Sequence, residues 1–249
     1  MIDSTPGLDI SSSPRSERTA PKDSGGGCVI ARTSLSSGER DQMFALFSDY
    51  FAHVTREVFE HDLDEKDWVI LLRDDDGSVS GFSTLMRLDV DGHPVFFSGD
   101  TIVARHRRST TDLPRLWVNH IRSVSGTLAG DIYWFLISSG YRTYRFLPVF
   151  FREFHPRFDG SPAQLKSMLD TIASRRFGAA YDPASGIVHL PAPSPLRDAE
   201  DDLEQRAQHD PHVRFFLEAN PGHAAGDELA CLVRVAHDNL TPAGARMLR

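Results

Sequence analysis

Apolar residues spaced for strands and helices begin at residue 28. Cys28 to Arg32 predicts a short strand, and after a Ser-rich turn a helix with one buried face follows, ending near His61. The apolar positions of this helix are Met43, Phe47, Tyr50, Phe51, Val54 and Val58. Ser37 is a partial capping signal for its start, because Arg40 stands where a capping box has Glu or Gln.

Three strands are expected next, joined by tight turns. Trp68 to Arg73 is an apolar run that ends at Asp76-Gly77, and Ser78 to Val90 follows it. A second turn at Asp91-Gly92 leads into Pro94 to Val103. Asp-Gly between strands is a hairpin signal, so the three strands are predicted to form an antiparallel meander.

The pattern then returns to helical spacing. A helix is predicted from Ser109–Asp112 onward, followed by a buried strand from Ile132 to Ile137 and a second, aromatic helix that Pro148 should kink. The first helix has its apolar face at Leu113, Leu116, Trp117, Ile121 and Val124, and the aromatic helix at Tyr141, Tyr144, Phe151 and Phe154. The central motif is therefore β-β-β-α-β-α.

The pattern is weaker at both ends of the chain. Residues 1–27 are Ser, Pro, Gly and charged residues that bury almost nothing, which predicts a disordered tail. Beyond about residue 160 we expect a helix from Ala163 to Arg175, strands at Gly186–Leu190 and Leu229–Val235, and a polar helix around Leu203. These segments hold too few apolar residues for a second core, so residues 28–249 are predicted to form one domain with a C-terminal extension.

Composition narrows the class of protein. The 249 residues are 40% hydrophobic, enough for a substantial core, and carry a formal net charge of −8, which disfavours a nucleic-acid-binding surface. Neither a signal peptide nor an apolar stretch long enough to span a membrane is visible. With only two cysteines, we expect no disulfide framework and no metal site, and a cytoplasmic protein.

A basic cluster precedes the helix that follows the meander. Arg105, His106, Arg107 and Arg108 place positive charge just before a helix N-terminus, where anions bind favourably. The alternative is a solvated basic loop that balances nearby acids.

The order of elements over residues 28 to 158 resembles the GNAT-like (acyl-CoA N-acyltransferase-like) superfamily, whose fold is α/β (α+β) with a mixed, mostly antiparallel sheet flanked by helices. In that family, backbone amides of an Arg/Gln-x-x-Gly-x-Gly/Ala loop hold the pyrophosphate of an acyl-CoA or acetyl-CoA. Arg108 matches the leading Arg, while Thr111 and Leu113 stand where the family has small residues. The donor-binding residues implied by the resemblance are Ile102, Val103, Arg105, Arg107, Arg108, Ser109, Thr110 and Thr111.

The same resemblance implies two catalytic residues. Asp100, in the Ser98-Gly99-Asp100 segment of the third meander strand, is the candidate base that takes a proton from an amine, provided that burial raises its pKa. Tyr144 is the candidate acid for the departing thiolate. The alternatives are a strand-end aspartate bonded to backbone and a tyrosine buried in the core.

The sequence thus favours an acyltransferase that moves an acyl group from a CoA thioester to a small-molecule amine. An acyl carrier protein is the alternative donor, because its acidic docking surface suits the basic loop. The competing hypothesis is a binding or scaffold protein that kept the fold and lost the cofactor.

Overall fold

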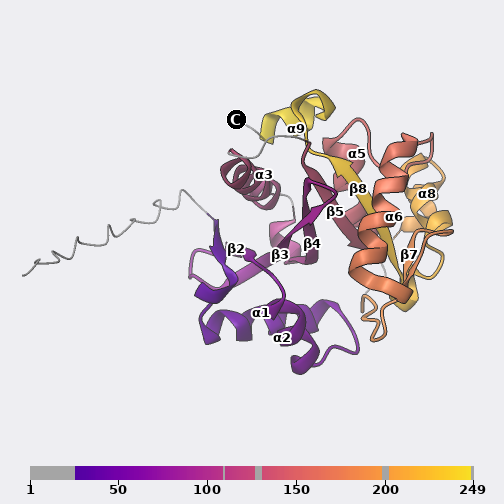
Figure 1. Cartoon of the computed structure of the whole chain (residues 1–249). Helices are drawn as coiled ribbons and strands as arrows, with labels where there is room; N and C mark the ends of the chain where they lie inside the picture. Colours follow the sequence, from indigo (N-terminus) through magenta and orange to yellow (C-terminus); the bar gives the residue numbers. More distant parts are fainter. Residues whose placement is uncertain (1–25, 109, 127–130, 198–201, 248–249) are drawn as a thin grey trace, which may run out of the picture.

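The computed structural model describes residues 26–108, 110–126, 131–197 and 202–247. Its centre is one eight-stranded sheet in the order β1-β2-β3-β4-β5-β8-β7-β6 (Figure 1). The strands are β1 (Gly27–Ala31), β2 (Trp68–Arg73), β3 (Val79–Val90), β4 (His93–Val103), β5 (Tyr133–Ser138), β6 (Tyr181–Asp182), β7 (Ile187–Val188) and β8 (Glu228–Arg234). Neighbouring strands run antiparallel, except that β4 and β5 run parallel. The predicted α/β class with a mixed, mostly antiparallel sheet is confirmed.

Helices cover both faces of the sheet (Figure 1). On one face pack α1 (Ser37–Tyr50), α2 (Arg56–Asp64) and α6 (Ala163–Phe177). On the other pack α3 (Asp112–Ser125), α4 (Tyr141–Tyr144), α5 (Phe146–Phe150), α7 (Leu203–Ala207), α8 (Pro211–Ala219) and α9 (Pro242–Met247). Strand β2 shows how alternation makes the two cores, because Val69 and Leu71 face α1 and α2 while Ile70 faces the α3 side.

The single helix expected to end near His61 is wrong, since the chain forms two helices there. Phe51 is extended and bridges to Leu196, and His53 has a positive φ of 60°, so the segment between α1 and α2 is not helical. Thr55 then starts α2, its side chain accepting from the backbone N–H of Val58 at 3.3 Å. The start of α1 is also capped more completely than expected, because Ser36 and Glu39 form a full capping box.

The meander is confirmed, with β2 at its predicted bounds and β3 and β4 each displaced by one residue at the start. The aromatic helix is interrupted at Arg145, between α4 and α5, because Pro148 has no N–H for the carbonyl of Tyr144. It ends at Phe150, so the prediction that placed Phe151 and Phe154 on this helix is wrong.

The C-terminal half continues the same sheet. Strand β8 pairs with β5 from Tyr133 to Ser138, and the β6–β7 hairpin extends the sheet beyond β8. Helices α8 and α9 and strand β6 were not expected. Most of the predicted tail, residues 1–25, lies outside the described residues, but Gly27 is a strand residue that pairs with Leu72.

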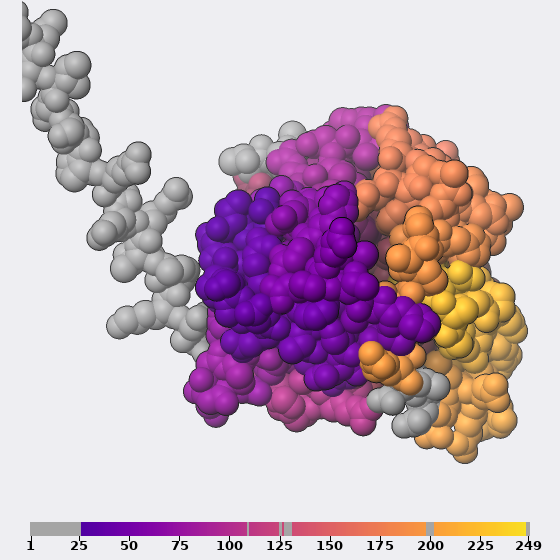
Figure 2. Space-filling model, turned by 90° about the horizontal axis from the view of Figure 1, so that it is seen from below, coloured from indigo at the N-terminus to yellow at the C-terminus, as the bar shows by residue number. Residues whose placement is uncertain are grey.

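The first helices and the C-terminal half also meet directly. The backbone N–H of Ala52 donates to the carbonyl of Pro195 at 2.8 Å, and that of Arg197 donates to the carbonyl of Tyr50 at the same distance. Figure 2 shows the early residues, in indigo and violet, in contact with orange residues of the C-terminal half. Both halves therefore border the face of the sheet that α1, α2 and α6 cover.

Candidate functional site

Strand β4 contains a bulge at Gly99 and Asp100. Leu85 pairs with Ser98 and Ser83 pairs with Thr101, so Thr84 alone faces the two bulge residues. A bulge adds one residue to a strand and re-aims the side chains next to it. Ser98 and Thr101 point toward α3. A side chain at position 99, where this chain has glycine, would point toward α2.

Strands β4 and β5 separate at this bulge. Their parallel pairing runs from Val95 with Tyr133 to Ser98 with Leu136, and past that point β4 pairs only with β3 among the described strands. A slot opens where the two strands part, beneath α3.

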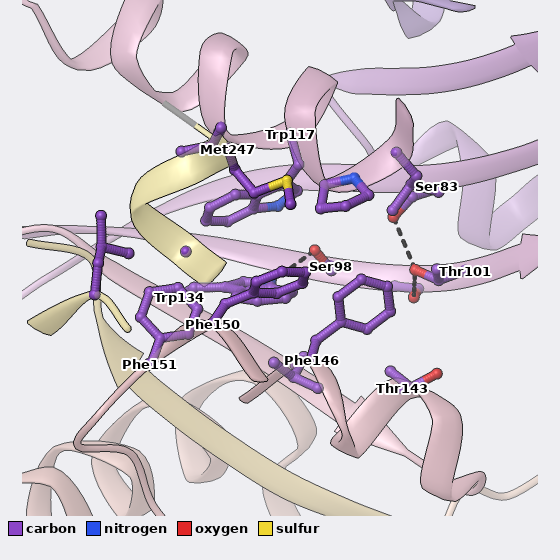
Figure 3. A pocket seen from close by; sticks show the side chains of 17 residues that line it. Ser83, Ser98, Thr101, Trp117, Trp134, Thr143, Phe146, Phe150, Phe151 and Met247 are labelled. Atoms are coloured by element: carbon purple, nitrogen blue, oxygen red, sulfur yellow. Dashed lines mark hydrogen bonds between the residues drawn. The ribbon is translucent and has the colours of Figure 1, made fainter. Parts of the chain in front are cut away.

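The slot holds a cavity of about 40 Å³ with mostly apolar walls. Its lining comprises Ser83, Ser98, Gly99, Thr101, Leu113, Pro114, Trp117, Val118, Trp134, Leu136, Thr143, Phe146, Phe150, Phe151, Leu240, Gly244 and Met247. Figure 3 shows the aromatic rings facing each other across it, with Met247 of α9 next to Trp117. Ligand pockets usually measure several hundred Å³, so a bound chain requires side chains such as Phe146 or Met247 to move.

Few polar atoms interrupt these walls. The indole N–H of Trp134 donates to Ser98 Oγ at 2.9 Å, and the hydroxyls of Ser83 and Thr101 are 2.8 Å apart (Figure 3). Trp117 is only 5% exposed, and its indole N–H has no partner among the described residues. A buried donor without an acceptor is costly. The slot therefore suits a largely apolar chain that carries a hydrogen-bond acceptor such as a carbonyl oxygen.

Asp100 is half-buried and stands between two residues of the slot lining, Gly99 and Thr101, without lining the slot itself. The pKa of Asp100 is raised to about 7, mainly by burial and then by the charge of Asp62, while the charge of Lys66 lowers it. The side chain of Lys66 is fully buried, with Nζ 2.6 Å from the carboxylate of Asp62. A carboxylate with a pKa near neutrality is suited to act as a general base.

A second carboxylate with a raised pKa, that of Glu228, lies near Asp100. The pKa of Glu228 is raised to about 8, mainly by burial and also by the charge of Asp100, while a hydrogen bond with Ser139 lowers it. Glu228 directly precedes the apolar run of β8, and the sequence analysis did not single it out. Only its position beside a buried strand set it apart from other surface acids.

The structure places Tyr144 away from the slot. It is 0% exposed, its hydroxyl donates to the carbonyl of Pro156 at 3.1 Å, and its ring packs between Tyr141 and Phe216. Burial raises its pKa well above the ordinary value for tyrosine. Its neighbour Thr143 reaches the slot instead, and we do not assign Tyr144 the role of acid.

The basic cluster lies at the N-terminus of α3, but two of its cations face acids. Arg107 Nη2 is 2.9 Å from Asp112 Oδ2, and His106 Nε2 is 2.9 Å from Asp74 Oδ2. The guanidinium of Arg108 stacks on the ring of Tyr50 at 5.0 Å. Local acids thus offset part of the positive charge.

The remaining residues that the resemblance assigned to the donor are spread around this loop. Ile102 is buried on the α1–α2 face, so its side chain does not line the slot. The carbonyl of Val103 accepts from Arg108 Nε at 3.1 Å, and the Thr110 hydroxyl donates to the carbonyl of Arg107 at 3.0 Å. Arg105 is exposed, Thr111 is the N-cap residue of α3 and makes no side-chain cap bond, and Ser109 lies outside the described residues.

Among the described residues, no group of three or more His, Cys, Asp or Glu side chains could hold a metal ion. None of the helices within the described ranges is long and apolar enough to cross a membrane.

No protein-family model matches the sequence, and no curated protein matches it. Solved structures do match. The GNAT-family N-acetyltransferase YhbS of Escherichia coli in complex with CoA gives a TM-score of 0.35 at 16% identity, covering 51% of this chain and 71% of that one. N-acetylglutamate synthase of Neisseria gonorrhoeae gives 0.38 at 16%, covering 63% and 34%. Rv2747 of Mycobacterium tuberculosis in complex with CoA gives 0.35 at 11%, covering 84% and 99%.

These identities and scores are too low to transfer an activity. The structure has the predicted β-β-β-α-β-α order over β2 to α4.

Proposed function

We propose that this protein is an acyltransferase that moves an acyl group from a thioester donor to the amine of a small molecule. The observation that carries the proposal is the bulge of β4. Asp100, whose pKa is raised to about 7, belongs to this bulge, and its chain neighbours Gly99 and Thr101 line the slot between β4 and β5.

In this proposal the thioester arm lies in the slot, where the Trp117 N–H is positioned to donate to a carbonyl oxygen of the arm. The donor supplies the activated acyl group. The amine nitrogen attacks the thioester carbonyl carbon, a C–N bond forms, the C–S bond breaks, and the sulfur leaves as a thiolate. Asp100 takes the proton that the amine loses. Holding both reactants in place supplies much of the acceleration.

The two ends of a CoA molecule fit this structure differently. The apolar slot suits the thioester arm, whereas Asp112 puts a carboxylate in the first turn of α3, where the pyrophosphate would bind. Arg108, exposed beside the ring of Tyr50, is the proposed contact for phosphate groups. A phosphopantetheine on an acyl carrier protein depends less on phosphate contacts at this loop, so we include it as the alternative donor.

The test is release of free thiol in the presence of a panel of amines, with acetyl-CoA, longer acyl-CoAs and acylated carrier protein as donors. We expect turnover with at least one donor and loss of turnover in Asp100→Asn. Failure of all three donor types both to bind and to react would refute the proposal.

A non-catalytic binding protein is the second candidate. The pairing of Arg107 with Asp112 favours it, because it removes positive charge from the phosphate position. Under this alternative a thioester or its thiol raises the melting temperature of the protein while no amine is acylated.

A further inference from the structure

Charged groups on the α2 side of the β4 bulge are paired, except for two carboxylates. The ion pairs there are Lys66 with Asp62 at 2.6 Å, Arg176 with Glu65, and His189 with Asp227 at 2.8 Å. Within the described part of the chain, Asp100 and Glu228 belong to no ion pair. Lys66 acts on Asp100 only through its field. Two carboxyl groups therefore remain without a cation in direct contact.

These two carboxyl groups lie on two strands that a third strand separates. Asp100 is in the bulge of β4 and Glu228 begins β8, with the end of β5 between them in the sheet. The two carboxyl groups interact electrostatically across the end of β5, because the charge of Asp100 raises the pKa of Glu228. The strand axes are roughly 10 Å apart, because neighbouring strands lie about 4.8 Å from one another.

An orphaned hydroxyl on the same side of the sheet is independent of these charges. Thr84 is 0% exposed, and its Oγ1 has no hydrogen-bond partner among the described residues. A Cβ on Gly99 would lie 2.7 Å from this oxygen and 3.0 Å from Lys66 Cε, so the hydroxyl faces the space that the glycine leaves empty. A buried hydroxyl without a partner indicates a missing polar group, and a ligand N–H would supply it.

We propose that Glu228 binds a second cationic nitrogen of the acceptor, so that the acceptor is a small dication. This inference rests on the proposed function. The reacting amine lies at Asp100, and a second ammonium, a few carbon atoms away, lies at Glu228. A dication offers one positive charge to each of the two unpaired carboxyl groups. The spacing between its two charges spans the distance between β4 and β8, which β5 separates. A monoamine leaves one carboxylate without a counter-charge, and a half-buried charge without a partner is costly.

The first experiment measures binding without any donor, at low salt. Calorimetry compares diamines from 1,3-diaminopropane to 1,6-diaminohexane with the monoamines of equal chain length. We expect at least one diamine to bind the wild-type protein tenfold or more tightly than its monoamine. Glu228→Gln should remove this preference and leave monoamine affinity within about twofold. Glu218→Gln, the same change at an exposed site on α8, should keep the preference.

Equal affinity for diamine and monoamine, no binding of either class, or a preference that survives Glu228→Gln would overturn the inference.

A second experiment separates this inference from the proposed function. Thiol release is measured with the same amines in the wild-type, Glu228→Gln and Glu218→Gln proteins. Acylation of monoamines as fast as of diamines leaves the acyltransferase in place and overturns the role of Glu228. Diamine-selective binding without any thiol release has the opposite meaning: it supports the dication site and counts against the enzyme.

Discussion

Replacing Asp100 with Asn should have opposite effects on activity and on stability. The aspartate is held half-buried next to Asp62, and its pKa is raised from 3.8 to about 7. A carboxyl group whose pKa is raised on folding costs nothing below pH 3.8, and it becomes destabilising as the pH rises from there to about 7. Three pKa units at about 1.4 kcal/mol each give an upper limit of about 4 kcal/mol. Lys66 and solvent contact reduce the effect, so we expect a gain of about 1–3 kcal/mol for Asp100→Asn at pH 8.5.

The activity should change in the other direction. An amide cannot accept the proton of the amine, so kcat/KM should fall by about 10²–10⁴-fold. In the wild-type protein the advantage over Asp100→Asn should grow as the pH rises to about 7 and then level off. The amine itself titrates in both proteins, so the ratio of the two profiles isolates the contribution of Asp100.

The measurements are thiol release from pH 5 to 9 and urea unfolding at pH 4.5 and 8.5. A gain in stability at pH 8.5 that shrinks at pH 4.5, together with a loss of activity, is the expected pair of results. Asp100→Asn that retains activity, with a ratio of rates independent of pH, would refute the role of base. A stability difference that is the same at both pH values would show that Asp100 is not destabilised by ionisation.

Three other variants test the slot, the loop and the bulge. Trp117→Phe should weaken donor binding by about 1–2 kcal/mol in calorimetry and cost less unfolding free energy than Trp134→Phe, which breaks a formed hydrogen bond. Arg108→Ala should lower affinity for acyl-CoA up to tenfold and leave acyl-pantetheine binding, which needs no phosphate contact, unchanged. Gly99→Ala should lower the free energy of unfolding in urea by about 1–3 kcal/mol, because its Cβ would meet Thr84 Oγ1 at 2.7 Å, and adding Thr84→Ala should restore most of it.

The parts of the fold that the sequence predicted are those where local pattern and tertiary packing agree. Strand β2 is a continuous apolar run because both of its faces are buried, and the turns beside it carry Asp-Gly. The break between α1 and α2 escaped prediction because Phe51 and Val54 fit the helical period. The bridge from Phe51 to Leu196, 145 positions later in the chain, is a long-range contact that no local pattern contains.

The candidate site residues also divide into those that a local sequence pattern could indicate and those that only tertiary packing brings together. Asp100 was a candidate because the GNAT-like resemblance implied a base there, and the bulge accounts for the glycine that precedes it inside the strand. Glu228 and Lys66 come from segments far apart in sequence, and only the sheet order and the end of α2 bring them near Asp100. Tyr144 lies outside the slot lining, and an aromatic at helical spacing is equally compatible with a core and with a cleft. Its hydrogen bond to Pro156 depends on the path of the chain after α5.

Gly99 joins the two halves of the proposed site. It lines the slot under α3, and the space above its Cα on the opposite side of the sheet is bounded by Thr84 and Lys66. A residue with a side chain would fill that space, so the glycine leaves only backbone between the donor slot and the carboxylates. A thioester in the slot and an amine at Asp100 can then approach from opposite faces at the one place where β4 and β5 have separated. The bulge, the glycine and the diverging strands are thus one arrangement, which explains why an apolar donor slot and an acidic acceptor site lie next to each other without sharing side chains.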